Sequence, residues 1–185
     1  MSIAVAFYLL IIFAEIIFLG WAGLYIISLI FSWINGAPYV ATSKKELDQI
    51  LKSAKLKEND VFIELGCGDG RVLQKAAKDY GVTGWGIDIN PILIWKANIL
   101  KKIKKLDKIS FTRGNVKTAG FKNADVLYIF LFPKLVNTLK NKILQDTKKG
   151  VLIIAHGFKI DFLTKMHVKT LQGRYFKTYF YRLKK

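Results

Sequence analysis

The sequence is poor in cysteine and in acidic residues. It has 185 residues and one cysteine, Cys67, so no disulfide can form within the chain, which agrees with a reducing compartment. Only 13 acidic residues stand against 30 lysines and arginines. Charge is almost absent before Lys44, where Glu15 is the single charged residue. These absences exclude a disulfide-stabilised secreted fold and divide the chain into an apolar beginning and a strongly basic remainder.

Several kinds of catalytic machinery are also missing from the sequence. We find no Ser/His/Asp set, no cluster of metal-ligating residues and no pair of carboxylates at a spacing suited to acid–base catalysis. We therefore expect no bound metal and a reaction that does not need such groups.

Residues 3–34 form an almost uninterrupted apolar run. As a helix the run would be ~48 Å long, whereas the hydrocarbon core of a bilayer is about 30 Å thick. A signal peptide would be shorter and would begin with basic residues, which Met1 and Ser2 do not provide. We therefore expect an uncleaved, single-pass anchor over residues 1–36. The first basic residues, Lys44 and Lys45, follow the run, and the positive-inside rule then places the remainder of the chain in the cytoplasm.

The basic remainder has two interpretations. It is either a lysine-rich, solvated surface or a surface for an anionic partner such as lipid headgroups, an acidic substrate or nucleic acid. Because an anchor precedes it, the membrane surface comes first among these partners.

The most informative stretch is residues 61–71, Val-Phe-Ile-Glu-Leu-Gly-Cys-Gly-Asp-Gly-Arg. Its apolar first half predicts a buried strand of a parallel sheet. The three glycines allow the backbone to turn sharply and to approach a ligand closely. A helix is expected from Arg71 to Tyr80, and its free N–H groups would face that ligand. This order predicts a nucleotide-type site at the carboxyl end of the first strand.

The spacing of the glycines indicates which nucleotide is bound. Glu64-x-Gly66-x-Gly68-x-Gly70 differs from the G-x-G-x-x-G of dinucleotide folds and resembles the first motif of class I S-adenosylmethionine-dependent methyltransferases. Asp88 ends the next expected strand, where a carboxylate could accept hydrogen bonds from a ribose. The alternative is that Asp88 caps the helix that follows.

Strand and helix patterns alternate along the domain, which predicts a parallel sheet with crossover helices. The expected strands are 61–65, 84–88, 109–112, 124–131 and 150–155, and the expected helices are 71–80, 92–106 and 134–144. The end of the chain instead predicts an antiparallel hairpin of 168–171 and 175–183. We expect an α/β, Rossmann-like class I methyltransferase fold, a mostly parallel sheet closed by this hairpin and preceded by one transmembrane helix. Residues 37–59 would be a linker and a short helix that begins at a Ser43–Glu46 capping box, and residues 60–185 the methyltransferase domain.

From about Pro38 to Gly157 the sequence resembles one methyltransferase family. The motifs that carry the resemblance are Ala37-Pro-Tyr-Val-Ala-Thr42, Glu64-Leu-Gly-Cys-Gly-Asp-Gly-Arg71, Gly86-Ile-Asp-Ile-Asn-Pro91, Phe111-Thr-Arg-Gly-Asn115 and Ala124-Asp-Val-Leu-Tyr-Ile-Phe-Leu-Phe-Pro133. The family comprises small membrane-anchored enzymes whose mitochondrial members methylate lysines of the adenine nucleotide translocase and the ATP synthase c subunit. It has shorter bacterial and archaeal relatives.

The resemblance implies S-adenosylmethionine as cofactor and a set of contacts to it. Glu64, Gly66, Gly68 and Asp69 would contact its methionine part and Asp88 its ribose, with Cys67 and Ile89 as further cofactor contacts. Asn115 stands where such enzymes often place an Asp against the adenine amino group. An Asn can accept that hydrogen bond through its carbonyl oxygen.

The reaction needs an unprotonated nucleophile held against a methyl group, away from water. We expect Phe132 and Pro133 to be pocket walls, with Tyr39 and Tyr128 as further candidates. The alternative for each is core packing, which is favoured for Tyr128. His156 could accept a proton or be structural. No Asn-Pro-Pro-Tyr-type tetrapeptide follows the fourth strand, which argues against methylation of nucleic-acid bases.

The sequence therefore predicts a membrane-tethered methyltransferase that acts on lysines of a protein at or in the membrane. The bilayer would be contacted through residues 3–34 and a basic surface, and nucleic acid is not expected as a partner. A small-molecule or lipid methyltransferase and a non-enzymatic cofactor-binding scaffold are the alternatives.

Overall fold

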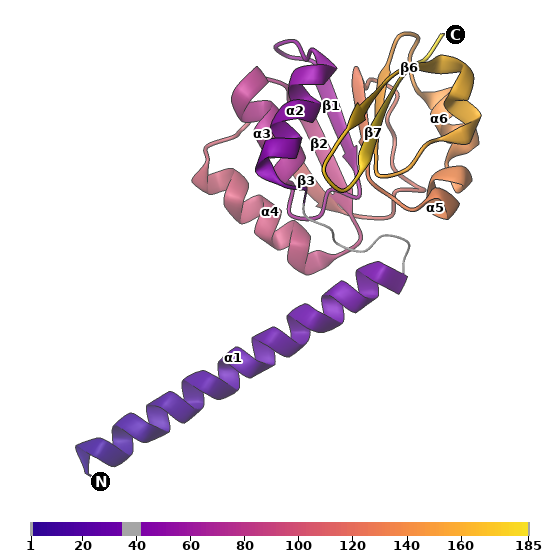
Figure 1. The fold of residues 1–185 in the computed structure, drawn as a ribbon. Coiled ribbons are helices and arrows are strands. Elements are labelled where there is room, and N and C mark those ends of the chain that lie inside the picture. The colour runs from indigo at the N-terminus through magenta and orange to yellow at the C-terminus, as the bar shows by residue number, and fades with distance from the viewer. Residues whose placement is uncertain (1, 35–41, 185) are drawn as a thin grey trace.

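The computed structural model describes residues 2–34 and 42–184 as a long N-terminal helix beside an α/β domain (Figure 1). The helices are α1 (Ile3–Ile34), α2 (Lys44–Ala54), α3 (Arg71–Tyr80), α4 (Pro91–Ile103), α5 (Pro133–Thr138) and α6 (Lys140–Asp146), with a 3-10 helix η1 (Asp161–Met166). The strands are β1 (Val61–Leu65), β2 (Thr83–Asp88), β3 (Ile109–Arg113), β4 (Val126–Ile129), β5 (Leu152–His156), β6 (His167–Gln172) and β7 (Lys177–Arg182).

The strands form one seven-stranded sheet in the order β3-β2-β1-β4-β5-β7-β6. Strands β1 to β5 run parallel, whereas β7 is antiparallel to both β5 and β6. The predicted parallel sheet with a closing antiparallel hairpin is therefore confirmed. The order reverses at β1 and β4, so the carboxyl ends of these strands border the crevice in which such sheets bind ligands.

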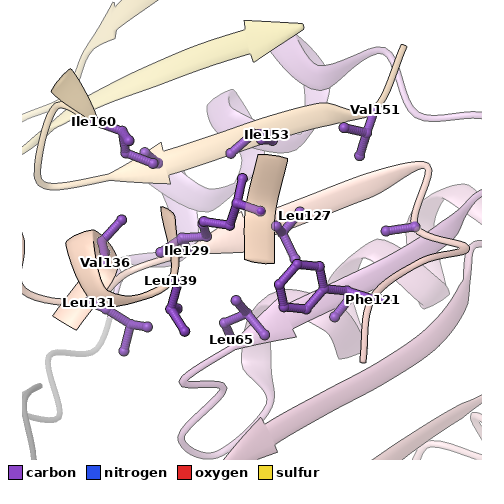
Figure 2. Packing of buried hydrophobic residues seen from close by; sticks show 14 of the residues in the cluster. Leu65, Phe121, Leu127, Ile129, Leu131, Val136, Leu139, Val151, Ile153 and Ile160 are labelled. Atoms are coloured by element: carbon purple, nitrogen blue, oxygen red, sulfur yellow. The ribbon is translucent and has the colours of Figure 1, made fainter. Parts of the chain in front are cut away.

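The sheet has helices on both faces. Helices α2, α3 and α4 cover one face and α5 and α6 cover the other (Figure 1). Side chains alternate along β4, so that Tyr128 packs toward α2 whereas Leu127 and Ile129 pack on the opposite face. Figure 2 shows this second core, in which Leu127 and Ile129 meet Val136 and Leu139. The near-continuous burial of the parallel strands explains their unbroken apolar sequences.

Most predicted boundaries differ from the structure by one to three residues, and one predicted helix is divided in two. The helix expected at 134–144 is two helices, α5 and α6, because the N–H of Leu139 bonds to the carbonyl of Val136 in a tighter turn. Helix α4 ends before Leu106 because Lys105 has a left-handed φ of +54°. Strand β4 is shorter than the apolar run that predicted it.

The last third of α1 contacts the domain at the start of α4. The side-chain nitrogen of Asn90 donates to the Ser28 carbonyl and to Ser32 Oγ, both at 2.8 Å. Both serines and Asn90 are buried. The ring of Trp21 stacks on that of Trp95, with 6.3 Å between their centroids. Helix α1 is also long and apolar enough to cross a membrane.

Asn90 has a second role, because its Oδ1 accepts the N–H groups of Ile92 and Leu93 and so caps α4. We expect Asn90→Ala to lower the free energy of unfolding by about 1 to 3 kcal/mol, since the cap and the bonds to α1 are both lost. Asn90→Ser keeps a cap acceptor but loses the amide N–H donors, so it should cost less. Denaturation of the detergent-solubilised chain measures both. Equal decreases in the free energy of unfolding for the two variants would mean that the cap contributes nothing to stability.

Candidate active site

The loop between β1 and α3 requires glycine at three alternate positions. Gly66, Gly68 and Gly70 have φ values of +73°, +52° and +72°, in the left-handed region that favours glycine. Glycine is also required at two of these positions because a side chain would not fit. A Cβ on Gly66 would lie 2.5 Å from Leu131 Cδ2, and one on Gly70 would lie 2.5 Å from the ring of Phe111. The predicted glycine loop is thus a tight turn over the carboxyl ends of the strands.

One buried and one half-buried carboxyl group hold this loop and the start of α3. Glu64 Oε2 accepts the N–H of Leu73 at 3.1 Å, and Asp88 Oδ2 accepts the N–H of Gly68 at 2.8 Å. Burial raises the pKa of both carboxyl groups, that of Glu64 well above its usual range. Asp88 Oδ1 also accepts the N–H of Asn90, so Asp88 supports the residue that caps α4 and is not the cap itself.

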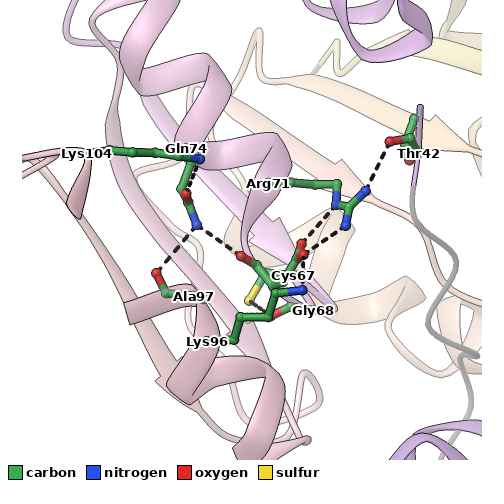
Figure 3. A network of polar contacts seen from close by, with 9 residues as sticks. Thr42, Cys67, Gly68, Arg71, Gln74, Lys96, Ala97 and Lys104 are labelled. Carbon is green, nitrogen blue, oxygen red and sulfur yellow. Dashed lines mark hydrogen bonds and ion pairs between the residues drawn. The ribbon is translucent and has the colours of Figure 1, made fainter. Parts of the chain in front are cut away.

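Asp69, in the same loop, has basic partners. Arg71 binds it through two nitrogens, at 2.8 and 3.0 Å, and Lys96 Nζ lies 3.2 Å from its Oδ2. Figure 3 shows Arg71 and Gln74 reaching this loop from α3 and Lys96 reaching it from α4. Within residues 2–34 and 42–184, in contrast, neither Glu64 nor Asp88 forms an ion pair. These two carboxyl groups therefore have no fixed cationic partner, and a cationic ligand would favour their ionised form.

Two hollows open around the glycine loop, and they share Ser32, Gly66 and Asp88. The predicted cofactor contacts that line the first hollow are Glu64, Gly66, Cys67, Gly68, Asp69 and Asp88. Those that line the second are Gly66, Asp88, Ile89 and Asn115. The structure thus brings together all the residues that the sequence proposed for the cofactor. Ser32 of α1 also lines both hollows, and no sequence pattern predicts this because Ser32 belongs to the apolar run.

Asn115 keeps part of its hydrogen-bonding capacity. Its Oδ1 accepts the N–H of Lys117 at 3.0 Å, and its side chain is exposed. An amide oxygen has a second lone pair, so this bond does not exclude the predicted contact with an amino group.

Four rings form a cluster beside the first hollow. We name Tyr128, Phe130, His156 and Phe176 the aromatic cluster. The ring centroids of Phe130 and His156 are 4.5 Å apart and those of Phe130 and Phe176 5.5 Å apart, in edge contacts, and Tyr128 lies 6.5 Å from His156. Tyr128 and Phe130 also line the first hollow, so the cluster adjoins the glycine loop.

Among residues 2–34 and 42–184, two buried polar atoms of the cluster have no hydrogen bond of ordinary geometry. They are Tyr128 OH, which lies near Thr42, and His156 Nε2, and a third such atom is Glu46 Oε1 of α2. His156 Nδ1 lies 2.8 Å from Thr178 Oγ1, and burial lowers the pKa of the imidazole to about 4, so the ring is neutral at pH 7. Unpaired buried polar atoms are costly and are uncommon in native proteins. They are suited to receive the polar end of a ligand.

Two of the residues predicted as catalytic, Phe132 and Pro133, do not line the two hollows at the glycine loop. Phe132 immediately precedes α5 and makes an edge contact with Phe158 at 5.8 Å. Pro133 lines a third hollow together with His156 and Phe158. Tyr39 lies outside the described residues. The catalytic roles of Phe132, Pro133 and Tyr39 therefore stay predictions. Among the described aromatic residues, Tyr128 and Phe130 are the two that line the first hollow at the glycine loop.

Comparisons with known proteins agree with this geometry. Residues 64–167 match the family model described as the ANTKMT methyltransferase domain. A protein-lysine N-methyltransferase from Saccharolobus islandicus is 34% identical over 133 residues, which are 70% of this chain and 81% of that protein.

Two solved structures are similar as well, and both hold S-adenosyl-L-homocysteine. An RNA methyltransferase from Salinibacter ruber superposes with a TM-score of 0.74 at 28% identity, over 79% of this chain and 95% of that chain. A methyltransferase from Geobacter sulfurreducens gives a TM-score of 0.57 at 19% identity, over 62% and 48% of the two chains.

Proposed function

We propose that this chain, which belongs to the ANTKMT methyltransferase family, methylates lysine side chains of a protein at the membrane surface. The chain is an S-adenosylmethionine-dependent methyltransferase with a Rossmann-like class I fold. The lysine substrate is supported by the Saccharolobus islandicus relative, which is a protein-lysine N-methyltransferase.

The residues around the glycine loop fit the cofactor. S-adenosylmethionine carries two positive charges, on its sulfonium and amino groups, and supplies the reactive methyl group when bound. Glu64 and Asp88 provide carboxyl groups that have no ion-pair partner among the described residues, in a protein whose net charge is +17. In the proposed arrangement Glu64 and the loop from Gly66 to Asp69 hold the methionine part. Asp88 and Ile89 hold the ribose, and Asn115 meets the adenine.

The buried polar atoms of the aromatic cluster are the observation that carries the lysine proposal, because Tyr128 and Phe130 line the first hollow and both lie against His156. A lysine side chain that enters along Phe130 would present its amine to Tyr128 OH and His156 Nε2. The apolar rings disfavour the ammonium form, whose pKa in water is about 10.4, and so help the amine lose its proton. A neutral His156 can accept a hydrogen bond from the amine and orient its lone pair toward the methyl group.

The membrane location is supported by α1. Its length and apolar composition suit a single-pass anchor, and the first lysines follow it, which favours a cytoplasmic domain. In this proposal the anchor confines the enzyme to substrates at the bilayer.

The substrate is tested with the full chain in membranes from its source cells, supplied with methyl-labelled S-adenosylmethionine. The products are divided into protein, organic extract and RNA, and labelled protein is analysed by mass spectrometry. We expect label in protein, on methylated lysine. Label confined to the organic extract would identify a lipid or small-molecule substrate. Label confined to RNA would mean that the chain methylates RNA, as the name of the Salinibacter ruber protein indicates for that protein. Either result would overturn the lysine proposal.

Glu64 predicts a pH dependence of cofactor binding. Because its pKa is raised in the free protein, the stability that comes from the neutral carboxyl is present at low pH and is lost as pH rises through the folded-state pKa. The positive cofactor favours the carboxylate, so binding should lower this pKa and release a proton. The affinity for the cofactor should therefore rise with pH between the pKa of Glu64 in the cofactor-bound protein and its higher pKa in the free protein.

Calorimetry in buffers of different ionisation enthalpy measures this proton release. Glu64→Gln should bind more weakly and should lose most of the pH dependence, since its amide does not titrate. Proton uptake by the native chain on binding would contradict the assignment of Glu64 to the positive part of the cofactor.

A further inference from the structure

We propose that the outward face of α4 is a second membrane-contact surface, which lies among the headgroups of an anionic bilayer. This inference rests on the membrane tether proposed for α1. It goes beyond the tether because it orients the whole domain on the membrane.

Helix α4 is apolar on both of its faces. The inward face packs on the sheet through Leu93, Ile94 and Ala97. On the outward face Trp95, Ile99 and Ile103 follow one another at intervals of four residues, so they form one stripe. These three side chains are 59%, 36% and 71% exposed. A helix with apolar residues all round is normally buried, so the stripe indicates a surface that something covers.

The stripe continues from the contact between α4 and the anchor. Figure 1 shows α4 on the side of the domain that faces α1. A span of about 20 residues counted from Ile3 ends near Trp21, which stacks on Trp95. Tryptophan is enriched at the level where membrane and water meet. The Trp21 and Trp95 pair therefore places the stripe at the membrane interface.

The charge around the stripe favours lipid over a second copy of the chain. Helix α4 contains no acidic residue, and the exposed Lys102 lies next to Ile103 at its carboxyl end, with Lys105 beyond. Lysines beside an apolar stripe can bury their stems while the ammonium groups reach lipid phosphates. A second copy would bring the same lysines and would be repelled.

This docking would also restrict the substrate. Helix α4 begins three residues after Asp88, and Ser32 of the anchor lines both cofactor hollows. A domain that lies on α4 therefore holds its cofactor site close to the bilayer. The lysines within its reach are those in the headgroup region of membrane proteins.

The test uses the full chain with fluorescent labels at single introduced cysteines. The native Cys67 is 4% exposed and burial raises the pKa of its thiol, so it should not compete for the label. The labelled sites are Ile103→Cys on the stripe, Phe13→Cys in α1 and Asn141→Cys on α6, which covers the opposite face of the sheet. Each protein is reconstituted in vesicles of phosphatidylcholine and phosphatidylglycerol that carry nitroxides at the headgroup or in the acyl chains.

We expect the label at position 103 to be quenched by headgroup nitroxides several times more than the label at 141, and the label at 13 to be quenched by acyl-chain nitroxides. Equal quenching at 103 and 141 would overturn the proposal even if α1 is inserted. A label at 103 that is shielded from aqueous iodide but not quenched by lipid would assign the stripe to a protein partner and would also overturn it. Lysine methylation is measured separately on the same vesicles, so its absence would refute the proposed substrate without affecting this result.

A matched pair of variants tests the stripe itself. With the label at Lys102→Cys, the changes Ile99→Ser and Ile103→Ser together should remove most of the lipid quenching. Val168→Ser with Tyr175→Ser changes two side chains that are 57% and 71% exposed on the closing hairpin, and should leave the quenching unchanged. Similar losses in both pairs would mean that the stripe has no special contact with lipid.

Discussion

Asp88→Ala is expected to weaken the binding of S-adenosylmethionine by roughly 100-fold or more and to reduce methyl transfer at least as much. The Asp88 carboxylate ends β2, bonds the Gly68 N–H at 2.8 Å and lines both hollows. A hydrogen bond to a charged acceptor contributes about 1.5 to 3 kcal/mol, and two ribose hydroxyls would lose this acceptor together. Calorimetry with S-adenosylmethionine and with S-adenosylhomocysteine measures the affinity.

Asp125 immediately precedes β4, at the end of the strands opposite to Asp88, and is a matched control. Its substitution separates an effect on cofactor binding from an effect on folding. Asp125 Oδ2 also accepts a backbone N–H, that of Val61 at 2.9 Å, and its side chain pairs with Lys148. Asp125→Ala should lower the free energy of unfolding but leave the cofactor affinity of the folded protein unchanged. If both variants bound the cofactor as tightly as the native chain, Asp88 would not be the ribose acceptor.

Tyr128→Phe is expected to lower kcat roughly 10- to 100-fold with little change in cofactor affinity. Its hydroxyl is buried beside the first hollow, near Thr42 but without a hydrogen bond of ordinary geometry among the described residues, and burial raises its pKa, so it stays protonated. The ring is retained in the variant, so packing against Phe62 and His156 is kept. Because removal of an unpaired buried hydroxyl relieves a desolvation cost, the free energy of unfolding should rise by about 1 kcal/mol.

Tyr181 provides the control for this variant. It is as buried as Tyr128, but its hydroxyl accepts the N–H of Ile160 at 2.9 Å on the other face of the sheet. Tyr181→Phe should therefore destabilise the domain and leave kcat unchanged. A Tyr128→Phe enzyme with native kcat would remove the main support for the lysine site, although the cofactor site would stand.

We expect the free energy of unfolding to rise in Tyr128→Phe and to fall in Tyr181→Phe because the two faces of the sheet differ. Along β4, the side chains that face α5 and α6 fill a dry core, in which every apolar group contributes to folding. On the other face, Tyr128 lies beside polar atoms without partners, next to the hollow that the glycine loop forms. A bound substrate could form hydrogen bonds with these polar atoms that the folded domain does not form by itself.

The sequence by itself determined the cofactor side of the site. Glu64, the three glycines and Asp88 lie within two strands and one turn, so their spacing along the chain already places them at one edge of a parallel sheet. The long helix α1 could be predicted for a similar reason, because a long apolar run is a local property of the chain.

Only the tertiary structure decided the rest. Tyr128 and His156 come from β4 and β5, and their rings lie 6.5 Å apart because these two strands are neighbours in the sheet. Phe132 and Pro133 follow the same strand but line neither hollow at the glycine loop, since the chain turns into α5 at that point. Ser32 reaches the hollows because Asn90 bonds to the end of α1. Contacts between residues far apart in the chain depend on strand order and helix docking, and these leave no pattern in the spacing of a single sequence.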